Sequence, residues 1–472
     1  MNIILSKQEL IKKAKEVLRS VVGDIRIHPD SMIVGGTVRD ILLGRTPKDI
    51  DIATPETTEL VRILTEKGFT HVLLDEDRDI HRMVINGTHV DITPLKEGNI
   101  TDLLTRDFTI NAIGIVIKTW QVLDPQKGLP DLSKGLIRTL NEERFINDPL
   151  RMIRAFRIAA DINFQIDPVT LRMITKHSHL INTTSMERIR DELCWTFEAP
   201  MSFRLLEGLN RSHLFDRIFP EFSKVKRVPS NSPQITGLAE HLLWTYKYFE
   251  DIMANLDDVL LEHADSAREL LCKEVGGGHS LFVIVKFTAL LHDIGKPQTM
   301  TMDDNVHFIG HDEVGAKIIS ERMKKLRFSG AEIVVAETLV KEHMRPHNLA
   351  KLDKISKRAI YRFFRDLDYL AIPSLLIALA DAYATEMLPW GSLEAYAEFI
   401  RAMISESIII GKPKPILSGK DIMKKLSLEP GPMVGKIQTD LLEAQALGKI
   451  ETEKEALAFI KERFDSYESK KK

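Results

Sequence analysis

The fold of the amino-terminal third is decided by the stretch Ile33-Val34-Gly35-Gly36-Thr37-Val38-Arg39-Asp40, which continues through Gly44-Arg45 to Asp49-Ile50-Asp51. Its pattern predicts a buried strand over 32–34, a helix over 38–43 that stops at Gly44, and a second strand over 50–53. Residues two apart on a strand point to the same face, so Asp49 and Asp51 are expected to bind the same divalent cations. We therefore expect a head built around a strand that carries paired carboxylates.

The same stretch has the chemistry of a magnesium and phosphate site. Carboxylate oxygens suit Mg²⁺, which also takes substrate phosphates as ligands. Two Mg²⁺ ions at Asp49 and Asp51 would activate an attacking hydroxyl and stabilise a pyrophosphate leaving group. Gly35 and Gly36 allow the backbone to approach a phosphate at a helix start. Arg39, one turn later, is expected to pair with the triphosphate.

Further strands are expected over 71–74, 83–85 and 89–93, the last two joined by the hairpin signal Asn86-Gly87. Asp91, in the last of these strands, is a candidate third catalytic carboxylate; an ordinary exposed aspartate is the alternative. Taken singly, two nearby aspartates or a glycine pair are typical of ordinary strands and turns. Their ordered combination indicates a site.

Helical periodicity begins near Asp148 and continues through the remainder of the chain. The expected fold class is α+β, with a small head of mixed sheet and helices followed by an all-α remainder. The expected boundaries are 1–30 for an N-terminal helical segment, 31–140 for the head, 141–228 for a helical neck, 238–390 for a histidine-containing domain, and 391–472 for a helical tail.

The composition excludes several classes of protein. The 472 residues predict about three domains. With 44% apolar and 28% charged residues, the chain is an ordinary globular protein, and a net charge of −3 excludes a generally basic coat. Two cysteines exclude a disulfide scaffold and a four-cysteine zinc site. The longest apolar run, 370–380, contains Pro373, so we expect no membrane segment and a cytoplasmic location.

Two motifs of the head carry a family resemblance. Residues 33–51 follow the pattern LVGGxVRDxLLGRxxxDxD, and residues 105–112 follow RRDFTINA except at Thr105. In these motifs the chain resembles class II tRNA nucleotidyltransferases, which comprise the CCA-adding enzymes and bacterial poly(A) polymerases of the DNA polymerase β superfamily. The resemblance implies a polymerase-β-like nucleotidyltransferase head in which Arg106 contacts the nucleotide phosphates and Asp107 lies near the ribose. The nucleotide-binding residues that it implies in the head are Gly35, Gly36, Arg39, Asp40, Arg106, Asp107 and Asn111.

Without the resemblance, residues 106 and 107 would be interpreted as a polar helix start with Asp107 as its cap. Thr105 stands where the family has an arginine, which removes one expected phosphate contact.

The start of the neck resembles the family's base-reading helix. Residues 147–157 match EDxxRxxRxxRF, with Asn147 in place of the glutamate. Asp148, Arg151 and Arg154 share one stripe of a helix, where an arginine fork beside a carboxylate suits a Watson–Crick edge. The resemblance assigns Asp148 and Arg151 to nucleotide selection, with Arg154 nearby and Arg157 also binding nucleotide. A salt-bridged surface stripe is the alternative.

A second block of the neck, residues 185–193, matches the family's SxERIxxEL helix. It is interpreted as structural, with Glu187 or Arg190 bracing the neck.

The histidine-containing domain has a candidate metal site. His292-Asp293 follows an apolar helix, and imidazole with carboxylate ligands suits Mn, Ni, Fe or Zn, which would acidify a water for attack on a phosphoester. This region resembles the HD phosphohydrolase superfamily, which implies His241, His292, Asp293 and Asp381 as core ligands and His311 and His343 as a second position. A scaffold without activity is the alternative. His279 and His347 are assigned to the surface.

The tail resembles the tRNA-contacting C-terminal segment of CCA-adding enzymes over 417–422 and 430–435. Lysines there are expected to contact phosphates, which position an RNA without specifying its sequence. A helical cap with solvated lysines is the alternative. The lysines in question are Lys420, Lys424, Lys425 and Lys436.

The resemblance implies template-independent addition of CMP, with AMP as a further candidate product, to the 3′ end of tRNA from CTP and ATP with Mg²⁺. Only nine residues, 96–104, separate Leu95 from Thr105. In CCA-adding enzymes a flexible loop in this place is associated with the switch from CTP to ATP, so the short segment favours a CC-adding enzyme. The alternatives are a bacterial poly(A) polymerase, a phosphohydrolase with a silent head, and a non-catalytic tRNA-binding protein.

Overall fold

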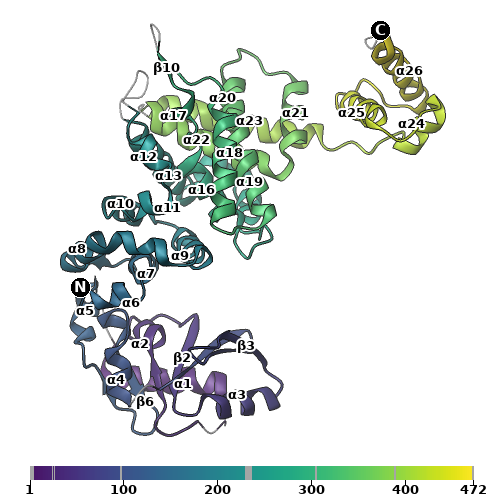
Figure 1. The fold of residues 1–472 in the computed structure, drawn as a ribbon. Coiled ribbons are helices and arrows are strands. Elements are labelled where there is room, and N and C mark those ends of the chain that lie inside the picture. Colours follow the sequence, from purple (N-terminus) through teal and green to yellow (C-terminus); the bar gives the residue numbers. More distant parts are fainter. Residues whose placement is uncertain are drawn as a thin grey trace. The chain divides into compact units, whose positions relative to one another are not determined.

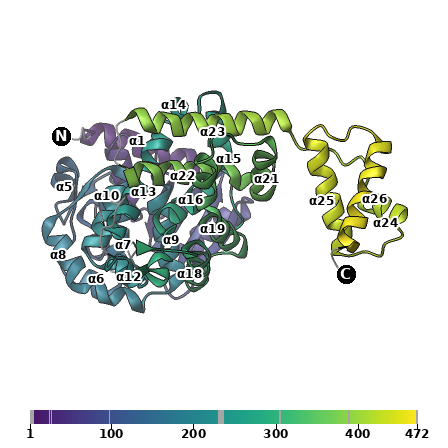
Figure 2. The ribbon, with the colours of Figure 1, turned by 90° about the horizontal axis from the view of Figure 1, so that it is seen from above.

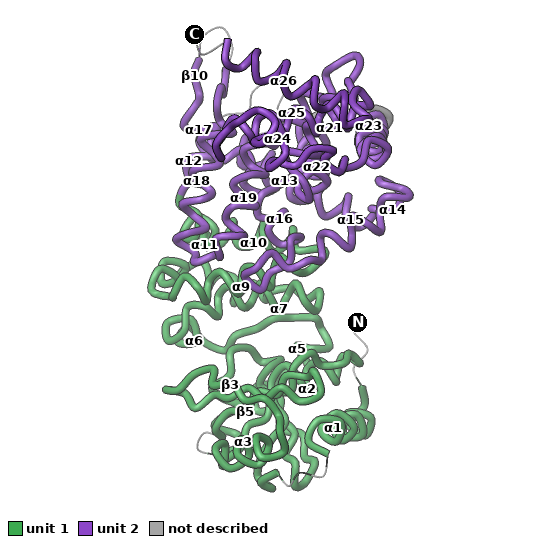
Figure 3. Tube along the Cα trace, turned by 90° about the vertical axis from the view of Figure 1, so that its right-hand side faces the viewer, with its two compact units in different colours: residues 1–220 green, residues 221–472 purple. Residues whose placement is uncertain are grey.

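The computed structural model describes residues 5–23, 25, 27–95, 98–228, 237–302, 306–386 and 390–469. The chain divides into two compact units, Met1–Pro220 and Glu221–Lys472 (Figure 3). Most of the expected break between neck and histidine domain, 229–236, and the first two residues of the short segment 96–104 lie outside the described residues.

A seven-stranded mixed sheet forms the centre of the head (Figure 1). Its strand order is β3-β4-β5-β2-β1-β6-β7, and β2 and β5 run parallel whereas the other neighbours are antiparallel. The strands are β1 (Met32–Val34), β2 (Asp49–Thr54), β3 (Thr70–Asp75), β4 (Ile80–Ile85), β5 (Thr88–Pro94), β6 (Gly114–Val116) and β7 (Val122–Leu123).

The sheet register places the acidic side chains of the head on one face. Asp51 of β2 pairs in register with Asp91 of β5, and Asp49 lies two residues earlier on β2. The hairpin expected at Asn86-Gly87 joins β4 to β5, and both residues have positive φ, 50° and 79°, as a type I′ turn requires. The expected α+β fold with a mixed sheet is confirmed.

Helices complete the head. The helix expected over 38–43 begins three residues earlier, at Gly35, and ends at Leu42, so the glycine pair forms its first turn. The other head helices are α1 (Lys7–Val22), α3 (Thr57–Glu66), α4 (Asn99–Leu104), a 3₁₀ turn (Thr109–Asn111) and α5 (Gly128–Lys134), with α2 spanning Gly35–Leu42.

The neck belongs to the same compact unit as the head and is almost entirely helical. A short parallel pair, β8 (Leu136–Ile137) and β9 (Gln165–Ile166), links its first helices to the preceding chain. Apolar residues of α7, among them Ile153 and Phe156, are buried. The neck helices are α6 (Glu143–Asn147), α7 (Arg151–Ile162), α8 (Pro168–His177), α9 (Met186–Glu198), α10 (Phe203–Arg211) and α11 (Leu214–Ile218), with a 3₁₀ turn at Ser178–Thr183.

The second unit is helical apart from the small hairpin β10 (Thr301–Met302) and β11 (Val306–His307). Helix α16 is apolar except at Lys286 and Thr288, and ten of its eleven residues are buried, so it forms the centre of this unit. The helices of this unit before the tail are α12 (Phe222–Val225), α13 (Leu238–Ala254), α14 (Leu256–Leu260), α15 (Ala264–Leu271), α16 (Leu281–Leu291), α17 (Lys296–Thr299), α18 (His311–Lys325), α19 (Gly330–Glu342), α20 (Met344–Ala350), α21 (Lys357–Leu367), α22 (Ala371–Glu386) and α23 (Trp390–Ile410).

The long helix α23 leads to three tail helices, α24 (Gly419–Leu426), α25 (Pro432–Ala446) and α26 (Glu453–Ser469), which pack on one another around Ile437 and Leu441 (Figure 2). Helix α25 is joined to α21 by the carboxylate of Glu443, which is 6% exposed and accepts hydrogen bonds from Arg358 and Arg362.

One stretch, Lys357–Thr385, is long and apolar enough to cross a membrane by length and composition, and 78% of its apolar window is buried inside the structure, as in a core helix. Pro373 does not interrupt this stretch, because α22 runs through it. Pro373 lies in the first turn of the helix, where backbone N–H groups have no carbonyl partner within the helix, so its missing N–H costs no hydrogen bond.

Candidate active site

A pocket of about 330 Å³ lies in the first unit, between the glycine turn, the strand ends and the neck helices. Elements far apart in the sequence supply its walls, which combine carboxylates with arginines, as an anionic substrate and its cations require. The lining residues are Gly35, Gly36, Asp51, Arg78, Ile80, Thr93, Pro94, Asp102, Thr105, Arg106, Asp107, Asn111, Asp148, Leu150, Arg151, Arg154 and Arg188.

Asp51 is the acidic residue of β2 that lines this pocket. Its backbone N–H donates to Thr37 Oγ1 at 2.7 Å, which ties strand β2 to helix α2. Burial raises the pKa of Asp51; the Arg106 charge lowers it and the Asp91 charge raises it, with a net rise. A Cβ atom on Gly35, whose φ is +66°, would lie 3.0 Å from Asp51 Oδ2. Glycine is therefore required where the backbone passes this carboxylate.

The other two predicted carboxylates lie on the same sheet face but are not pocket residues. Asp49, 46% exposed, has His89 Nδ1 at 3.4 Å and Arg82 Nη2 at 4.0 Å. Asp91 receives a two-point bond from Arg82, with Nε–Oδ1 2.7 Å and Nη2–Oδ2 2.8 Å. The Arg82 guanidinium therefore partly neutralises the negative charge of Asp49 and Asp91.

The acidic face fits a hard divalent cation. Among the described residues, no side chain donates a hydrogen bond to the carboxylate of Asp51 or forms an ion pair with it. The atoms on this face that could bind a metal are the carboxylate oxygens. An unpaired, partly buried carboxylate is costly, so a bound cation would relieve it.

Arg39, Asp40 and Asn111 form a buried base under the glycine turn. Arg39, 8% exposed, donates to Asp40 Oδ1 at 2.9 Å through Nε and to Asn111 Oδ1 at 3.0 Å through Nη1. Arg39 is not among the residues that line the pocket. Arg106, by contrast, lines the pocket and is held by Asp102 at 2.9 Å.

Asp107 connects this base to the neck. It accepts from Asn111 Nδ2 at 2.9 Å and from Arg154 Nε at 2.8 Å. Burial alone would raise the pKa of Asp107, but the Arg154 charge and these hydrogen bonds hold it well below its usual range. Asp107 Oδ1 also accepts from the Phe108 N–H at 2.9 Å, but Phe108 and not Asp107 is the N-cap of the following 3₁₀ turn, so the predicted cap is wrong.

The predicted nucleotide-selecting pair lines the same pocket, but the helix stripe expected to carry it is wrong, because Asp148 has extended backbone before α7 begins at Arg151. Arg151 Nε lies 3.7 Å from Asp148 Oδ2, and both residues are pocket residues together with Asp51. Arg157 is not a pocket residue; it donates to Glu192 Oε2 at 2.6 Å and stacks on the Trp195 ring.

Sequence reasoning missed three residues of this region. Arg188 and Arg78 line the pocket, and Glu192, 2% exposed, holds Arg157 and lies 3.6 Å from Arg154. In the block 185–193, Glu192 makes these bonds to the arginines of α7.

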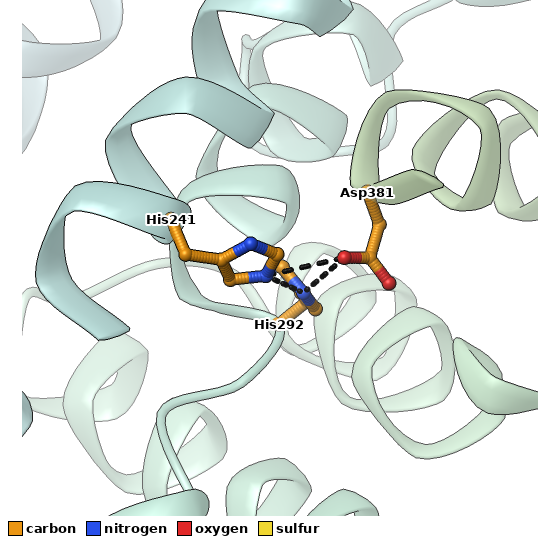
Figure 4. Close-up of side chains that lie close together, drawn as sticks. All are labelled: His241, His292 and Asp381. Carbon is orange, nitrogen blue, oxygen red and sulfur yellow. Dashed lines mark hydrogen bonds and ion pairs between the residues drawn. The ribbon is translucent and has the colours of Figure 1, made fainter. Parts of the chain in front are cut away.

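The six predicted ligands of the histidine domain converge on one buried cluster. His241 and His292 approach Asp381 with Nε2–Oδ1 distances of 3.1 and 3.6 Å (Figure 4). On the other side of the cluster, Asp293 Oδ1 lies 3.2 Å from His311 Nε2 and 3.5 Å from His343 Nε2. Two groups of three possible ligand atoms, His241-His292-Asp381 and His292-Asp293-His343, each lie within 4.8 Å of one another.

The imidazoles are oriented as metal ligands are. The Nδ1 atoms of His292, His311 and His343 lie 3.0, 2.7 and 2.6 Å from backbone carbonyl oxygens, which leaves each Nε2 facing the cluster. Asp293 Oδ1 is a buried oxygen without a hydrogen bond among the described residues. This donor set fits a divalent transition metal.

Two surface assignments of the sequence analysis are wrong. His347 Nε2 lies 2.8 Å from Asp381 Oδ2, and its Nδ1 is 3.1 Å from the Tyr396 hydroxyl. The spacing of four residues from His343 puts both on one helix face, a signal that could have revealed it. His279, 10% exposed, pairs with Glu332 at 2.6 Å.

The predicted lysines of the tail are exposed. Lys420, Lys424 and Lys425 belong to α24, and Lys436 of α25 lies 6.0 Å from the centre of the Tyr467 ring. They are available to a partner in solution.

Family models match three parts of the chain: the poly A polymerase head domain over residues 31–138, the probable RNA and SrmB-binding site of polymerase A over 163–225, and the HD domain over 238–386. Curated relatives cover most of the chain. The A-adding tRNA nucleotidyltransferase of Deinococcus radiodurans is 31% identical over 92% of this chain and 95% of its own. The CC-adding tRNA nucleotidyltransferase of Thermus thermophilus is 29% identical over 91% and 93%.

A solved structure shares the fold. The CCA-adding enzyme of Thermotoga maritima, complexed with tRNA, has a TM-score of 0.61 over 98% of this chain and 99% of that chain, at 18% identity.

Proposed function

We propose, from the premise that this chain belongs to the family of tRNA nucleotidyltransferases and poly(A) polymerases, that it adds CMP to the 3′ end of tRNA. The observation that carries this proposal is the single pocket that brings Asp51 of the sheet together with Asp148 and Arg151 of the neck. A metal-binding carboxylate beside a donor–acceptor pair for a base is what nucleotidyl transfer to a chosen nucleotide needs.

In the proposed reaction the tRNA 3′-hydroxyl attacks the α-phosphorus of CTP. A new P–O bond forms, the hydroxyl proton is lost to water, the bond from the α-phosphorus to the bridging oxygen breaks, and pyrophosphate leaves. When bound by Asp49 and Asp51, Mg²⁺ supplies charge neutralisation and lowers the pKa of the attacking hydroxyl. In this proposal Arg106, which is held by Asp102, contacts the phosphates, and Asp91 contributes to the acidic face.

Addition of two CMP residues, without the terminal AMP, is favoured by the short connection between β5 and the following motif. Residues 99–104 of this connection form the helix α4 and 105 is its cap, so the described part is ordered secondary structure. Both CC-adding and A-adding relatives resemble this chain, so the choice of nucleotide is the part of the proposal to be tested first.

The test uses the full chain with tRNAs that end before CCA, after C and after CC, each with CTP alone, ATP alone or both. We expect CTP to extend the first two substrates to CC and then to stop. Extension of the third substrate by ATP would instead indicate A addition, and long products on unrelated RNA would indicate a poly(A) polymerase. The double variant Asp49→Ala with Asp51→Ala should abolish incorporation, whereas the exposed Asp30→Ala should retain it; undiminished incorporation by the double variant refutes the proposal.

A second activity is favoured by the buried histidine cluster. We propose that it holds a divalent transition metal (Mn, Ni, Fe or Zn) and hydrolyses a phosphoester, since Asp293 Oδ1 is buried without a hydrogen bond among the described residues. Hydrolysis of model phosphoesters should be lost in His292→Ala and retained in Asp51→Ala. Absence of hydrolysis with every one of these metals would leave the cluster as a scaffold.

A further inference from the structure

His347 of α20 lies beside the histidine cluster and is not one of its six predicted ligands. Its Nε2 atom lies 2.8 Å from Asp381 Oδ2, and its side chain is 14% exposed. Its Nδ1 atom lies 3.1 Å from the hydroxyl oxygen of Tyr396, a residue of α23. The imidazole therefore bridges a carboxylate of the cluster, on α22, and a tyrosine on the next helix.

The two oxygens of Asp381 face different partners. Oδ1 lies 3.1 Å from His241 Nε2 and 3.6 Å from His292 Nε2, and it accepts a hydrogen bond from Thr385 Oγ1 at 3.2 Å. In Figure 4 this oxygen is directed at the two imidazoles, whereas the second oxygen points away from them. Oδ2 is the oxygen that His347 contacts. The carboxylate thus presents one oxygen to the cluster and the other to His347.

The partners of His347 determine which of its ring nitrogens carries the proton. An ionised carboxylate only accepts hydrogen bonds, so the short contact with Asp381 requires the proton on Nε2. In the neutral imidazole Nδ1 is then an acceptor, and the Tyr396 hydroxyl is a donor that satisfies it. The Tyr396 ring is held in turn by a T-shaped contact with Phe399, with 5.4 Å between the ring centres.

The contact between His347 and Asp381 is short but not yet well aligned. Among the described residues, the buried Nε2 atom of His347 has no partner with good hydrogen-bond angles. Hydrogen bonds of a functional site are often poorly aligned in the empty site and tighten when it is filled. A buried donor that is directed at a carboxylate of the cluster is therefore available to orient it.

The way in which this carboxylate binds a metal has a chemical consequence. A carboxylate binds a metal ion through one oxygen or through both. Binding through both would use a second position on the ion, and hydrolytic metal sites keep such a position open for water or substrate. A donor that occupies Oδ2 leaves only Oδ1 of Asp381 for the ion.

We propose that His347 is a positioning residue of the histidine cluster, which holds Asp381 Oδ2 so that Asp381 binds a metal ion through Oδ1 alone. Tyr396 keeps the proton of His347 on the nitrogen that faces Asp381. The inference rests on the metal site proposed above and adds to it the group that determines how one of its carboxylates binds. The open position would take a water or an oxygen of the phosphoester.

The experiment measures Mn²⁺ binding to the chelator-treated full chain by calorimetry and counts the exchangeable waters on bound Mn²⁺ by water-proton relaxation. We expect His347→Leu to weaken binding about 10–100-fold, as the loss of a group that orients a metal ligand does. It should also lose about one exchangeable water per chain, because Asp381 Oδ2 then takes that position. His347→Gln, which keeps an N–H donor, should restore most of both effects. Tyr396→Phe should weaken binding about threefold, since it removes one neutral hydrogen bond.

The matched control is His279→Leu. His279 is also a buried histidine paired with a carboxylate, since it lies 2.6 Å from Glu332. It precedes α16, and Glu332 lies in the first turn of α19, whereas His292 and His343 follow the other ends of these two helices. The control should lower the melting temperature and leave the Mn²⁺ affinity and the water count unchanged.

Unchanged Mn²⁺ affinity in His347→Leu would overturn the inference. A gain of an exchangeable water in this variant would also overturn it, because His347 would then be a metal ligand itself. A loss of affinity that His347→Gln does not relieve would do the same. If His347→Leu melts more than about 5 °C below the wild type, Tyr396→Phe decides alone, and unchanged affinity in it overturns the inference.

Failure of the proposed second activity is distinguishable from failure of this inference. A wild-type chain that binds Mn²⁺ but hydrolyses no phosphoester would contradict the activity, and the affinities of the variants would still decide the role of His347. A wild-type chain that binds none of Mn, Ni, Fe and Zn would overturn both.

Discussion

Asp107 Oδ2 accepts a hydrogen bond of 2.8 Å from Arg154 Nε, and this ion pair joins the head to the first long helix of the neck. It is one link in a continuous polar chain, since Asn111 connects Asp107 to Arg39, and Glu192 lies within 3.6 Å of Arg154. The spacing between the walls of the pocket therefore depends on ionised side chains.

Removal of the Asp107 charge should destabilise the chain in a pH-dependent way. We expect Asp107→Asn to lower the free energy of unfolding by about 2 kcal/mol at pH 7, the range for hydrogen bonds to charged groups. The pKa of Asp107 is lower in the folded than in the unfolded state, so its stabilisation is present above the ordinary aspartate pKa and is lost as pH falls through the folded value.

Urea denaturation at pH 7, 5 and 3.5 measures this difference, with the exposed Asp30→Asn as control. A wild-type advantage that does not shrink toward low pH would show that the ion pair is not its source.

We expect a side chain at Gly35 to impair activity because it would crowd Asp51. Gly44 serves as the control, since it has a similar backbone conformation without that neighbour. Gly35 and Gly44 both have positive φ, +66° and +72°, so alanine at either position costs about 1–2 kcal/mol of backbone strain. Only at Gly35 would the new Cβ meet Asp51 Oδ2, at 3.0 Å; around Gly44 nothing lies within 4 Å.

Both variants should lose similar stability in thermal melting, whereas Gly35→Ala should lose at least tenfold more nucleotide incorporation than Gly44→Ala. Equal activities would mean that the approach to Asp51 has no part in catalysis.

Metal binding to the histidine cluster should release protons. Although burial alone would lower it, the carboxylates of Asp293 and Asp381 raise the pKa of His292 to about 10 in the metal-free protein. At pH 7.5 this imidazole is protonated and must lose its proton to bind a metal. Titration of chelator-treated protein with MnCl₂ in buffers of different ionisation enthalpy should give at least one proton released per ion, and tighter binding at pH 8.5 than at 6.5.

The release should fall in His292→Asn and persist in His179→Asn, whose exposed imidazole lies in the other unit. Metal binding without any proton release would contradict the protonation assigned to His292.

The exposed lysines of the tail should contribute to the salt dependence of tRNA binding. Each lysine–phosphate contact adds about 0.7–0.9 to the slope of log K against log salt concentration, so replacing four lysines with alanine should lower the slope by about three. The replaced residues are Lys420, Lys424, Lys425 and Lys436.

Filter binding between 50 and 200 mM salt measures the slope, and replacement of four exposed lysines of the head provides the control, namely Lys7, Lys12, Lys13 and Lys67. If the control lowers the slope as much as the tail variant, the tail has no special contact with tRNA.

Local sequence patterns were sufficient to predict several elements of the head. The strand around Asp49 and Asp51 and the Asn86-Gly87 hairpin depend on neighbours in sequence, and both are confirmed. The helix expected over 38–43 is also present, but it begins at Gly35. The residues of the histidine cluster were named from the resemblance to the HD superfamily, and the local pattern indicated only that His292 follows an apolar helix.

Contacts between elements that are distant in the sequence could not be predicted from local patterns. Nothing near Arg188 in sequence indicates Asp148 as its partner, because this pair forms across two elements whose packing depends on the whole unit. The pairing of Arg82 with Asp91, by contrast, follows from the register that the two-residue turn Asn86-Gly87 gives to its hairpin. His347 is an intermediate case, since its helical spacing from His343 was available but its contact with Asp381 depends on the packing of α20 against α22.

The parallel pairing of β2 with β5 determines where the head can accept insertions. The two strands are aligned residue by residue from Asp49 with His89 to Thr54 with Pro94. A one-residue slip of β5 would turn Asp91 to the opposite side of the sheet, whereas extra residues at the tip between β3 and β4 would leave that alignment intact. Insertions accumulated over evolution should therefore be tolerated at the tip and purged from the two paired strands.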